Sequence, residues 1–137
     1  MSAVGPVMVI DDDADIREIL RAIIEIEGYR VVAASDGAQA LQQLRSGVRP
    51  CLILLDLRMP GMDGRTFCQV LREEPQIAGI PVVILSGDRD APVVAAALGA
   101  ECIVKPVDLH DLLSVVDRFC LREAEAVKPP PSPRGES

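Results

Sequence analysis

The side chains best suited to chemistry in this sequence follow apolar runs. Residues 11–13 are three consecutive aspartates after the first run, Asp56 follows the third, and Ser86 and Lys105 follow the fourth and fifth. In a doubly wound sheet, functional groups gather at the carboxyl ends of the strands, beside the point where strand order reverses. If the runs are strands of such a sheet, these groups lie together at one edge.

Such a cluster of carboxylates would be stabilised by a bound cation. One aspartate is explained as a helix N-cap, but each further close pair of carboxylates adds repulsion on the order of 4 kcal/mol near a protein surface. A hard divalent cation would offset this repulsion. Mg²⁺ keeps several waters and needs only one or two protein carboxylates plus phosphate oxygens, so we expect Mg²⁺ rather than a many-liganded Ca²⁺.

Asp56 is the candidate nucleophile, because a carboxylate can form an aspartyl phosphate. The incoming group would bring up to about two negative charges into an acidic pocket. The Lys105 ammonium would bind it as a point charge, and the Ser86 hydroxyl would donate to a phosphoryl oxygen.

The elements that must position these groups alternate along the chain. Five apolar runs predict strands at Val7–Ile10, Val31–Ala34, 51–55, 81–85 and 102–104. Amphipathic stretches after each run predict five helices, the last over Leu109–Phe119 with Asp108 as its N-cap. Gly28, Gly47 and Gly99 stand where helices end. This alternation predicts an α/β domain around a parallel sheet.

Composition fits one such domain. The 137 residues are 49 % hydrophobic and only 2 % aromatic, so the core is aliphatic, as suits a buried parallel sheet. The net charge of −7 argues against binding nucleic acid through a basic face. No apolar run approaches the ~18 residues of a membrane span, and no lysine or arginine precedes Asp11 to start a secretory signal. We therefore expect no membrane insertion and a cytoplasmic location.

Four cysteines are spread along the chain at Cys51, Cys68, Cys102 and Cys120, with His110 as the one histidine. No Cys-x-x-Cys pair is present, which argues against a zinc site or a redox motif. We expect buried structural thiols.

The helical periodicity stops after residue 121. Residues 122–137 contain Lys-Pro-Pro-Pro-Ser-Pro-Arg, which cannot bury apolar surface or sustain a helix. We expect a domain over residues 1–121 and a disordered, proline-rich tail over 122–137. If the chain is full length, it must act through this one domain.

Four motifs give the sequence a resemblance to response-regulator receiver domains over about residues 7–121. They are Val-Ile-Asp-Asp-Asp at 9–13, Leu-Leu-Asp-Leu-Arg-Met-Pro-Gly-Met-Asp-Gly at 54–64, Ser86-Gly87 and Lys105-Pro106. The resemblance implies a single doubly wound (βα)5 flavodoxin-like domain with a parallel five-stranded sheet of order 2-1-3-4-5. It also implies a phosphorylation switch of a two-component system.

The resemblance assigns Asp56 as the phosphoacceptor, contacted after phosphorylation by Ser86 and Lys105. The residues that would hold Mg²⁺ are Asp12, Asp56, Arg58 through its main-chain carbonyl, and Asp11 through water. Such a protein is a signalling phosphoacceptor rather than an enzyme, and its self-catalysed phosphorylation and dephosphorylation act on Asp56 only.

Further roles follow from the same resemblance. Ser86 and Cys102 would form the switch, with Cys102 at a position, three residues before the lysine, where the family often has an aromatic side chain. Arg58 and Asp88 would flank the phosphoryl group and tune the attack of water on it. The Lys105–Pro106 peptide bond would be cis, which an X-Pro bond permits at modest cost.

The implied partners are a sensor histidine kinase or a histidine phosphotransfer protein, and a downstream protein target, without direct nucleic-acid contact. Two other functions stay open. A degenerate receiver would dock to partners without ever taking phosphate. A haloacid-dehalogenase-like phosphatase would use Asp11-x-Asp13 as its nucleophile motif, but that fold normally needs a larger chain and leaves residues 54–64 unexplained.

Overall fold

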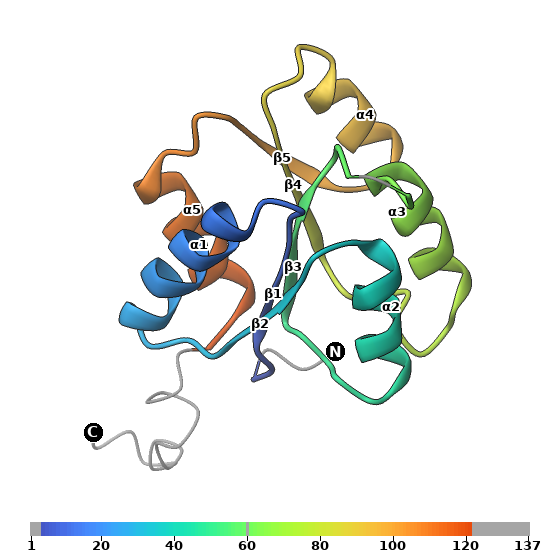
Figure 1. Cartoon of the computed structure of the whole chain (residues 1–137), viewed down its shortest axis with the longest axis horizontal. Coiled ribbons are helices and arrows are strands. Elements are labelled where there is room, and N and C mark those ends of the chain that lie inside the picture. Colours follow the sequence, from blue (N-terminus) through green and yellow to red (C-terminus); the bar gives the residue numbers. More distant parts are fainter. Residues whose placement is uncertain (1–3, 60, 122–137) are drawn as a thin grey trace, which may run out of the picture.

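The computed structural model describes residues 4–59 and 61–121, in which five strands alternate with five helices (Figure 1). The elements are β1 (Val7–Ile10), α1 (Ala14–Ile26), β2 (Val31–Ala34), α2 (Gly37–Arg45), β3 (Leu52–Asp56), α3 (Gly64–Glu73), β4 (Val82–Ser86), α4 (Ala91–Ala97), β5 (Glu101–Val104) and α5 (Leu109–Phe119). The predicted fold class is confirmed.

All five strands run parallel in the order β2-β1-β3-β4-β5, as predicted. β1, β3 and β4 are buried along their whole length, because helices cover both faces of the sheet. The chain leaves β1 toward α1 on one face and leaves β3 toward α3 on the other (Figure 1). The two loops therefore diverge at the carboxyl ends of β1 and β3, the kind of position where doubly wound sheets bind ligands.

Figure 1 shows α1 and α5 on one face of the sheet and α2, α3 and α4 on the other. Successive strand residues point to opposite faces. Val7 and Val9 accordingly join the apolar cluster under α1 and α5, while Met8 and Ile10 join the cluster under the other three helices. Each fully buried aliphatic side chain contributes roughly 1.5–3 kcal/mol, so the sheet is a rigid base for the residues at its edge.

Aspartate side chains cap the N-termini of four of the five described helices. Each accepts a hydrogen bond from a backbone N–H of the first turn, and the four are Asp13, Asp36, Asp63 and Asp108. Such a cap is worth about 1 kcal/mol. Asp13 is thus the aspartate of the first acidic run that helix capping explains, which leaves Asp11 and Asp12 for another role.

Two strands lie one residue later than predicted, and a third begins one residue earlier. β3 spans Leu52–Asp56 and β4 spans Val82–Ser86, while β5 starts at Glu101. The prediction ended each strand at its last apolar residue, but backbone pairing continues through the polar one. Asp56 and Ser86 are therefore fixed by the sheet ladder itself.

The cysteines differ from the expected set of buried thiols. Cys51 and Cys120 form a disulfide with a Cα–Cα distance of 5.5 Å, which is within the usual range. The two residues are 69 positions apart, so no short spacing motif reveals the pair. Cys68 is a buried free thiol and Cys102 a partly exposed one, and burial raises the pKa of both.

The predicted tail, residues 122–137, lies outside the described residues, so the domain boundary at residue 121 stays a prediction. The last described helix, α5, ends at Phe119. Within residues 4–59 and 61–121, no helix has the length and apolar character needed to cross a membrane.

Candidate functional site

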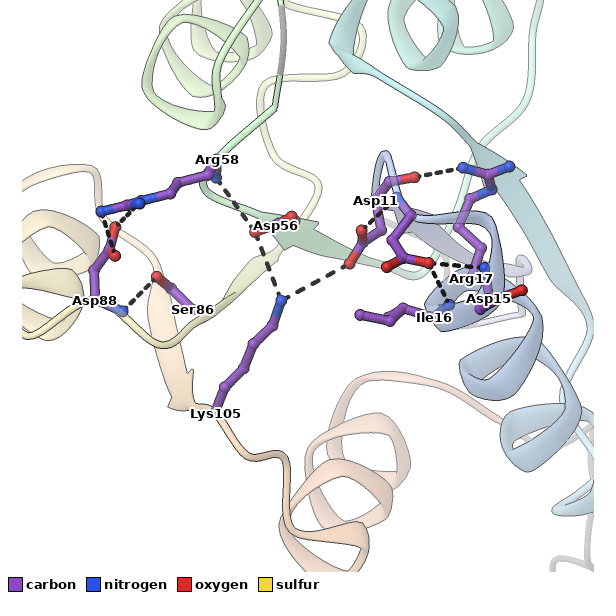
Figure 2. Close-up of polar contacts among 10 residues, drawn as sticks. Asp11, Asp15, Ile16, Arg17, Asp56, Arg58, Ser86, Asp88 and Lys105 are labelled. Carbon is purple, nitrogen blue, oxygen red and sulfur yellow. Dashed lines mark hydrogen bonds and ion pairs between the residues drawn. The ribbon is translucent and has the colours of Figure 1, made fainter.

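The predicted site residues meet at the carboxyl edge of the sheet, around the ends of β1 and β3 (Figure 2). Asp11 follows β1, Asp56 ends β3, Ser86 ends β4 and Lys105 follows β5. Figure 2 shows the Lys105 side chain extending from the end of β5 toward both Asp56 and Asp11. The fold thus brings together side chains from four separate strands.

Three carboxylates form an acidic cluster. Asp11, Asp12 and Asp56 each place a carboxylate oxygen within 4.8 Å of the other two. Asp11 is only 2 % exposed and Asp56 9 %, whereas Asp12 is exposed. Burial raises the pKa of both Asp11 and Asp56, and Coulomb repulsion from neighbouring aspartates raises it further. The cluster is therefore poised to attract positive charge.

Lys105 supplies part of that charge. Its Nζ lies 3.8 Å from Asp56 Oδ1 and 4.0 Å from Asp11 Oδ2. This ammonium lowers the pKa of both carboxyls and so opposes the effect of burial. Its side chain remains 30 % exposed, so a ligand entering from solvent can contact it. One ammonium facing three carboxylates leaves the cluster net negative.

A divalent cation fits this residual charge. Asp11 Oδ2 is buried and makes no hydrogen bond within the described residues, which is costly for a charged oxygen. Lys105 Nζ, at 4.0 Å, offsets this cost only in part. All the donors are hard oxygens, which Mg²⁺ prefers, and this ion needs only one or two protein carboxylates. The residues present therefore fit Mg²⁺.

Backbone N–H groups orient the Asp56 carboxylate and the Ser86 hydroxyl. The Arg58 N–H donates to Asp56 Oδ1 at 3.3 Å, and the Asp88 N–H donates to Ser86 Oγ at 3.1 Å. Ser86 is 3 % exposed. Because its oxygen accepts this bond, its own O–H stays available to donate. The edge of the sheet therefore presents a carboxylate, an ammonium and a hydroxyl donor toward one small volume.

A family model described as the response regulator receiver domain matches residues 7–117. The chain belongs to the response-regulator receiver family. Receiver domains are signalling phosphoacceptors of two-component systems, and they bind Mg²⁺ in an acidic pocket and act with histidine kinases and downstream effectors. The predicted family is thus confirmed.

This receiver is similar to named proteins over most of its length. It is 39 % identical over 113 residues to the DNA-binding response regulator MtrA of Mycolicibacterium paratuberculosis, a match that covers 80 % of this chain and 48 % of MtrA. It is 41 % identical to the probable transcriptional regulator ycf27 of Porphyridium aerugineum, over 77 % of this chain and 44 % of that protein. The chain thus spans about half the length of the curated relatives it matches.

A solved structure gives the same picture of the fold. A response regulator receiver protein from Pseudomonas putida superposes with a TM-score of 0.78 at 31 % sequence identity. The superposition covers 86 % of this chain and 99 % of that one. The receiver described here therefore has the whole architecture of that protein.

Arg58 and Asp88 form an ion pair at the rim of the receiver's pocket. Arg58 Nη2 lies 2.7 Å from Asp88 Oδ1, and its Nε donates to Asp88 Oδ2 at 2.8 Å. This two-point contact joins the loop after β3 to the loop after β4 (Figure 2). Both residues line a groove of about 500 Å³, and Asp12 lines the same groove. The ion pair and Asp12 of the acidic cluster thus share one solvent-facing groove.

Arg17 is a site residue that the sequence analysis missed. From α1, its Nη1 donates to the main-chain carbonyl of Asp11 at 2.7 Å. The Asp13 N–H in turn donates to Asp11 Oδ1 at 2.9 Å. These two bonds hold both the main chain and the side chain of Asp11 in place (Figure 2). The sequence feature that could have indicated Arg17 is a basic residue near the start of a helix that follows an acidic run.

Two other predicted residues lie outside the acidic cluster. Cys102 is in β5 and packs at the edge of the apolar cluster under α2, α3 and α4. The Lys105–Pro106 peptide bond is cis. The structure does not bring Cys102 into the acidic cluster, so its part in a switch stays a prediction.

Proposed function

We propose that this receiver accepts a phosphoryl group on Asp56 from a sensor histidine kinase or a histidine phosphotransfer protein, with Mg²⁺ held beside it. One observation carries the proposal: the buried Asp56 carboxylate lies within 4.8 Å of two further aspartates and 3.8 Å from the Lys105 ammonium. The Asp56 carboxylate can act as the nucleophile. A cation bound by the aspartates and the Lys105 ammonium can stabilise the negative charge of the incoming phosphoryl group.

In the proposed step, an Asp56 oxygen attacks phosphorus while the bond from phosphorus to the donor's imidazole nitrogen breaks. Among the described residues, Lys105 and the Arg58 N–H both contact Asp56 Oδ1, so Oδ2 is the proposed attacking oxygen. Lys105 then balances charge on the transferred group, and the Ser86 O–H donates to one of its oxygens. The nucleophile reacts as a carboxylate, so no proton leaves it.

The residues proposed to hold Mg²⁺ are Asp12, Asp56, Arg58 through its main-chain carbonyl, and Asp11 through water. When bound, the ion supplies positive charge to the phosphoryl group and to the acidic cluster. The β3 ladder orients Asp56, and the bonds from Arg17 and Asp13 orient Asp11. The protein's contribution is a carboxylate set that is already assembled.

The acyl phosphate is also proposed to form from small phosphodonors and to hydrolyse with help from the receiver alone. In this account the Arg58–Asp88 ion pair covers the phosphoryl group and limits the attack of water. An exposed ion pair is worth only about 0.2–1 kcal/mol. Its effect on the lifetime of the acyl phosphate is accordingly expected to be modest.

The proposed output is altered binding to a downstream protein. Ser86 would move toward the phosphoryl group, and Cys102 offers little bulk to fill the space behind it, so α4 would carry more of the change. MtrA is named as DNA-binding, but this chain matches about half of MtrA and has a net charge of −7. We therefore propose a protein target rather than nucleic acid. A cytoplasmic, stand-alone regulator stays a prediction.

Two rival functions are less well supported. A degenerate receiver has no need of the assembled set of Asp12, Asp56 and Lys105. A haloacid-dehalogenase-like phosphatase would need Asp13 beside Asp11 in the site, but the Asp13 side chain accepts hydrogen bonds from the backbone of α1. Asp13 is thus engaged as a helix cap.

The test is labelling by acetyl phosphate, followed by intact mass. Wild-type protein with Mg²⁺ is expected to gain one phosphoryl group, and to gain none in EDTA. Asp56→Asn should gain none in either buffer, while Asp36→Asn, the same change at a partly exposed helix cap, should label like wild type. Full labelling of Asp56→Asn, or labelling that ignores EDTA, would contradict the proposal.

A further inference from the structure

The disulfide joins the amino-terminal end of β3 to the carboxyl-terminal end of α5. Cys51 precedes β3, and its N–H donates to the Pro6 carbonyl at 3.0 Å. Cys120 directly follows α5 as its C-cap, in an extended conformation. The two side chains belong to the apolar cluster under α1 and α5. One sulfur is therefore anchored in the centre of the sheet, and the other stands on the last turn of a peripheral helix.

The environment of the pair accommodates two thiols as well as a disulfide. Cys51 Sγ lies 3.6 Å from the Pro6 carbonyl oxygen, so a Cys51 thiol has an acceptor within reach. The surrounding cluster is apolar, and a free cysteine packs there as a small hydrophobic residue. Reduction would thus place no polar group in the core without a suitable environment, because a thiol packs well there.

Any opening at the end of α5 is expected to be local. Its last turn is also held by the Tyr29 hydroxyl, which donates to Asp117, and by the packing of Val116, which is fully buried. Cys120 is 4 % exposed and its neighbour Leu121 is 43 % exposed. Helix ends open with little free energy compared with the core. A reductant therefore reaches Cys120 before Cys51.

We propose that Cys51 and Cys120 form a reversible redox site, through which a dithiol reductant releases the last turn of α5 from the sheet. Reversibility rests on the cytoplasmic location in the proposed function, because disulfides in reducing compartments are usually transient. A thiolate of the reductant attacks the Cys120 sulfur, and Cys51 leaves as a thiolate and takes a proton. The second thiol of the reductant then breaks the mixed disulfide, so two electrons pass to the protein.

Re-oxidation balances with a peroxide: two thiols and one hydrogen peroxide give the disulfide and two waters. The other cysteines do not compete. Cys68 and Cys102 pack with the cluster on the opposite face of the sheet, so the sheet separates them from this pair. Cys51 and Asp56 are five residues apart on an extended strand, or about 17 Å, which keeps the redox site clear of the acidic cluster.

The experiment treats the native full chain with dithiothreitol, alkylates it with a maleimide, and maps thiols and amide exchange by mass spectrometry. Two new thiols are expected, at Cys51 and Cys120, with amide exchange about tenfold faster over residues 117–121 and unchanged in β3. Hydrogen peroxide should restore the bond. Cys51→Ser should leave a Cys120 that is alkylated faster than the Cys51 of Cys120→Ser, and Cys68→Ser is the matched control with wild-type behaviour.

If the disulfide resists dithiothreitol until the whole domain unfolds, the proposal of a redox site is wrong and the disulfide is a permanent structural cross-link. Equal alkylation of Cys51 and Cys120 in the two single variants would overturn the order of attack. Acetyl phosphate labelling is run in both redox states and is expected to be equal. Loss of labelling in both states would contradict the proposed function alone, because the thiol count decides the redox site separately.

Discussion

The two ends of β3 hold opposite kinds of structure. At the carboxyl end, Asp56 faces two other carboxylates within 4.8 Å, and each such pair repels by roughly 3 kcal/mol in a surface-like dielectric. At the amino end, the Cys51–Cys120 disulfide closes a separation of 69 residues, worth about 4 kcal/mol to the oxidised chain. The same rigid strand thus carries a destabilising cluster at one end and a stabilising cross-link at the other.

The comparison indicates which end is built for a ligand. The Asp56 end retains buried carboxylate charge that a bound cation would offset. The opposite end is apolar and closed. The difference predicts that changes at the Asp56 end alter labelling and metal binding, with the disulfide unaffected.

The largest effect is expected from Lys105→Met, which removes the one ammonium that the described residues place at the Asp56 end. The transferred phosphoryl group then loses its ammonium contact, and the pKa of Asp56 rises further because an attractive charge is lost. The rate of labelling by acetyl phosphate should fall about 10²-fold, as for loss of one donor to developing charge. Lys128→Met, at the only other lysine of the sequence, is the control. A similar fall in labelling rate in that variant would show that the effect of Lys105→Met is not specific to the site.

Arg17→Met tests whether the acidic loop is held in place from α1. Loss of the bond to the Asp11 carbonyl should weaken Mg²⁺ binding about tenfold, as for other groups that orient metal ligands. Isothermal titration calorimetry measures this affinity, with partial recovery expected in Arg17→Lys and no change in Arg21→Met. Loss of a positive charge alone would tighten Mg²⁺ binding, so a tighter Arg17→Met variant would show that the residue acts only through its charge.

Replacing both Arg58 and Asp88 with alanine tests the lid over the groove. The lifetime of the acyl phosphate should shorten about 1.4- to fivefold, the range that follows from 0.2–1 kcal/mol for an exposed ion pair. Decay of the phosphorylated mass after removal of the phosphodonor gives the lifetime. The Arg65–Asp90 pair, at 4.0 Å and also exposed, provides the control double variant, and an unchanged lifetime in the Arg58 and Asp88 variant would refute the lid.

The smallest effect is on stability. Burial raises the pKa of Asp56 in the folded state, so its ionisation destabilises the fold at neutral pH, and this cost disappears as pH falls through the raised pKa toward 3.8. In EDTA, Asp56→Asn should raise the free energy of unfolding by roughly 1–2 kcal/mol at pH 7, the relieved repulsion less the lost attraction to Lys105. The gain should vanish in acid.

Denaturant unfolding at several pH values measures this gain. Asp63 is the control of opposite sign, because hydrogen bonding to the Thr66 N–H lowers its pKa. Its ionised form stabilises the fold at neutral pH, so Asp63→Asn should lower stability there. A gain for Asp56→Asn that persists unchanged in acid would show that charge is not its cause.

The two ends of β3 also differ in how far the sequence predicts them. Asp56 and its neighbours follow apolar strands in contiguous motifs, and a parallel sheet brings strand ends together, so the cluster follows from local patterns. The Cys51–Cys120 pair depends on how α5 packs across the sheet, which no local pattern contains. Arg17 was missed for a related reason, because its partner is a main-chain carbonyl that side-chain types do not reveal.

The most direct test of the central claim is to locate the phosphoryl group chemically. Borohydride reduces an aspartyl phosphate to homoserine, which peptide mass spectrometry assigns to a single residue. After acetyl phosphate and Mg²⁺, we expect homoserine at residue 56, in both the oxidised and the dithiothreitol-treated protein. Homoserine at residue 11 or 13 instead would move the nucleophile from β3 to the end of β1 and contradict the account.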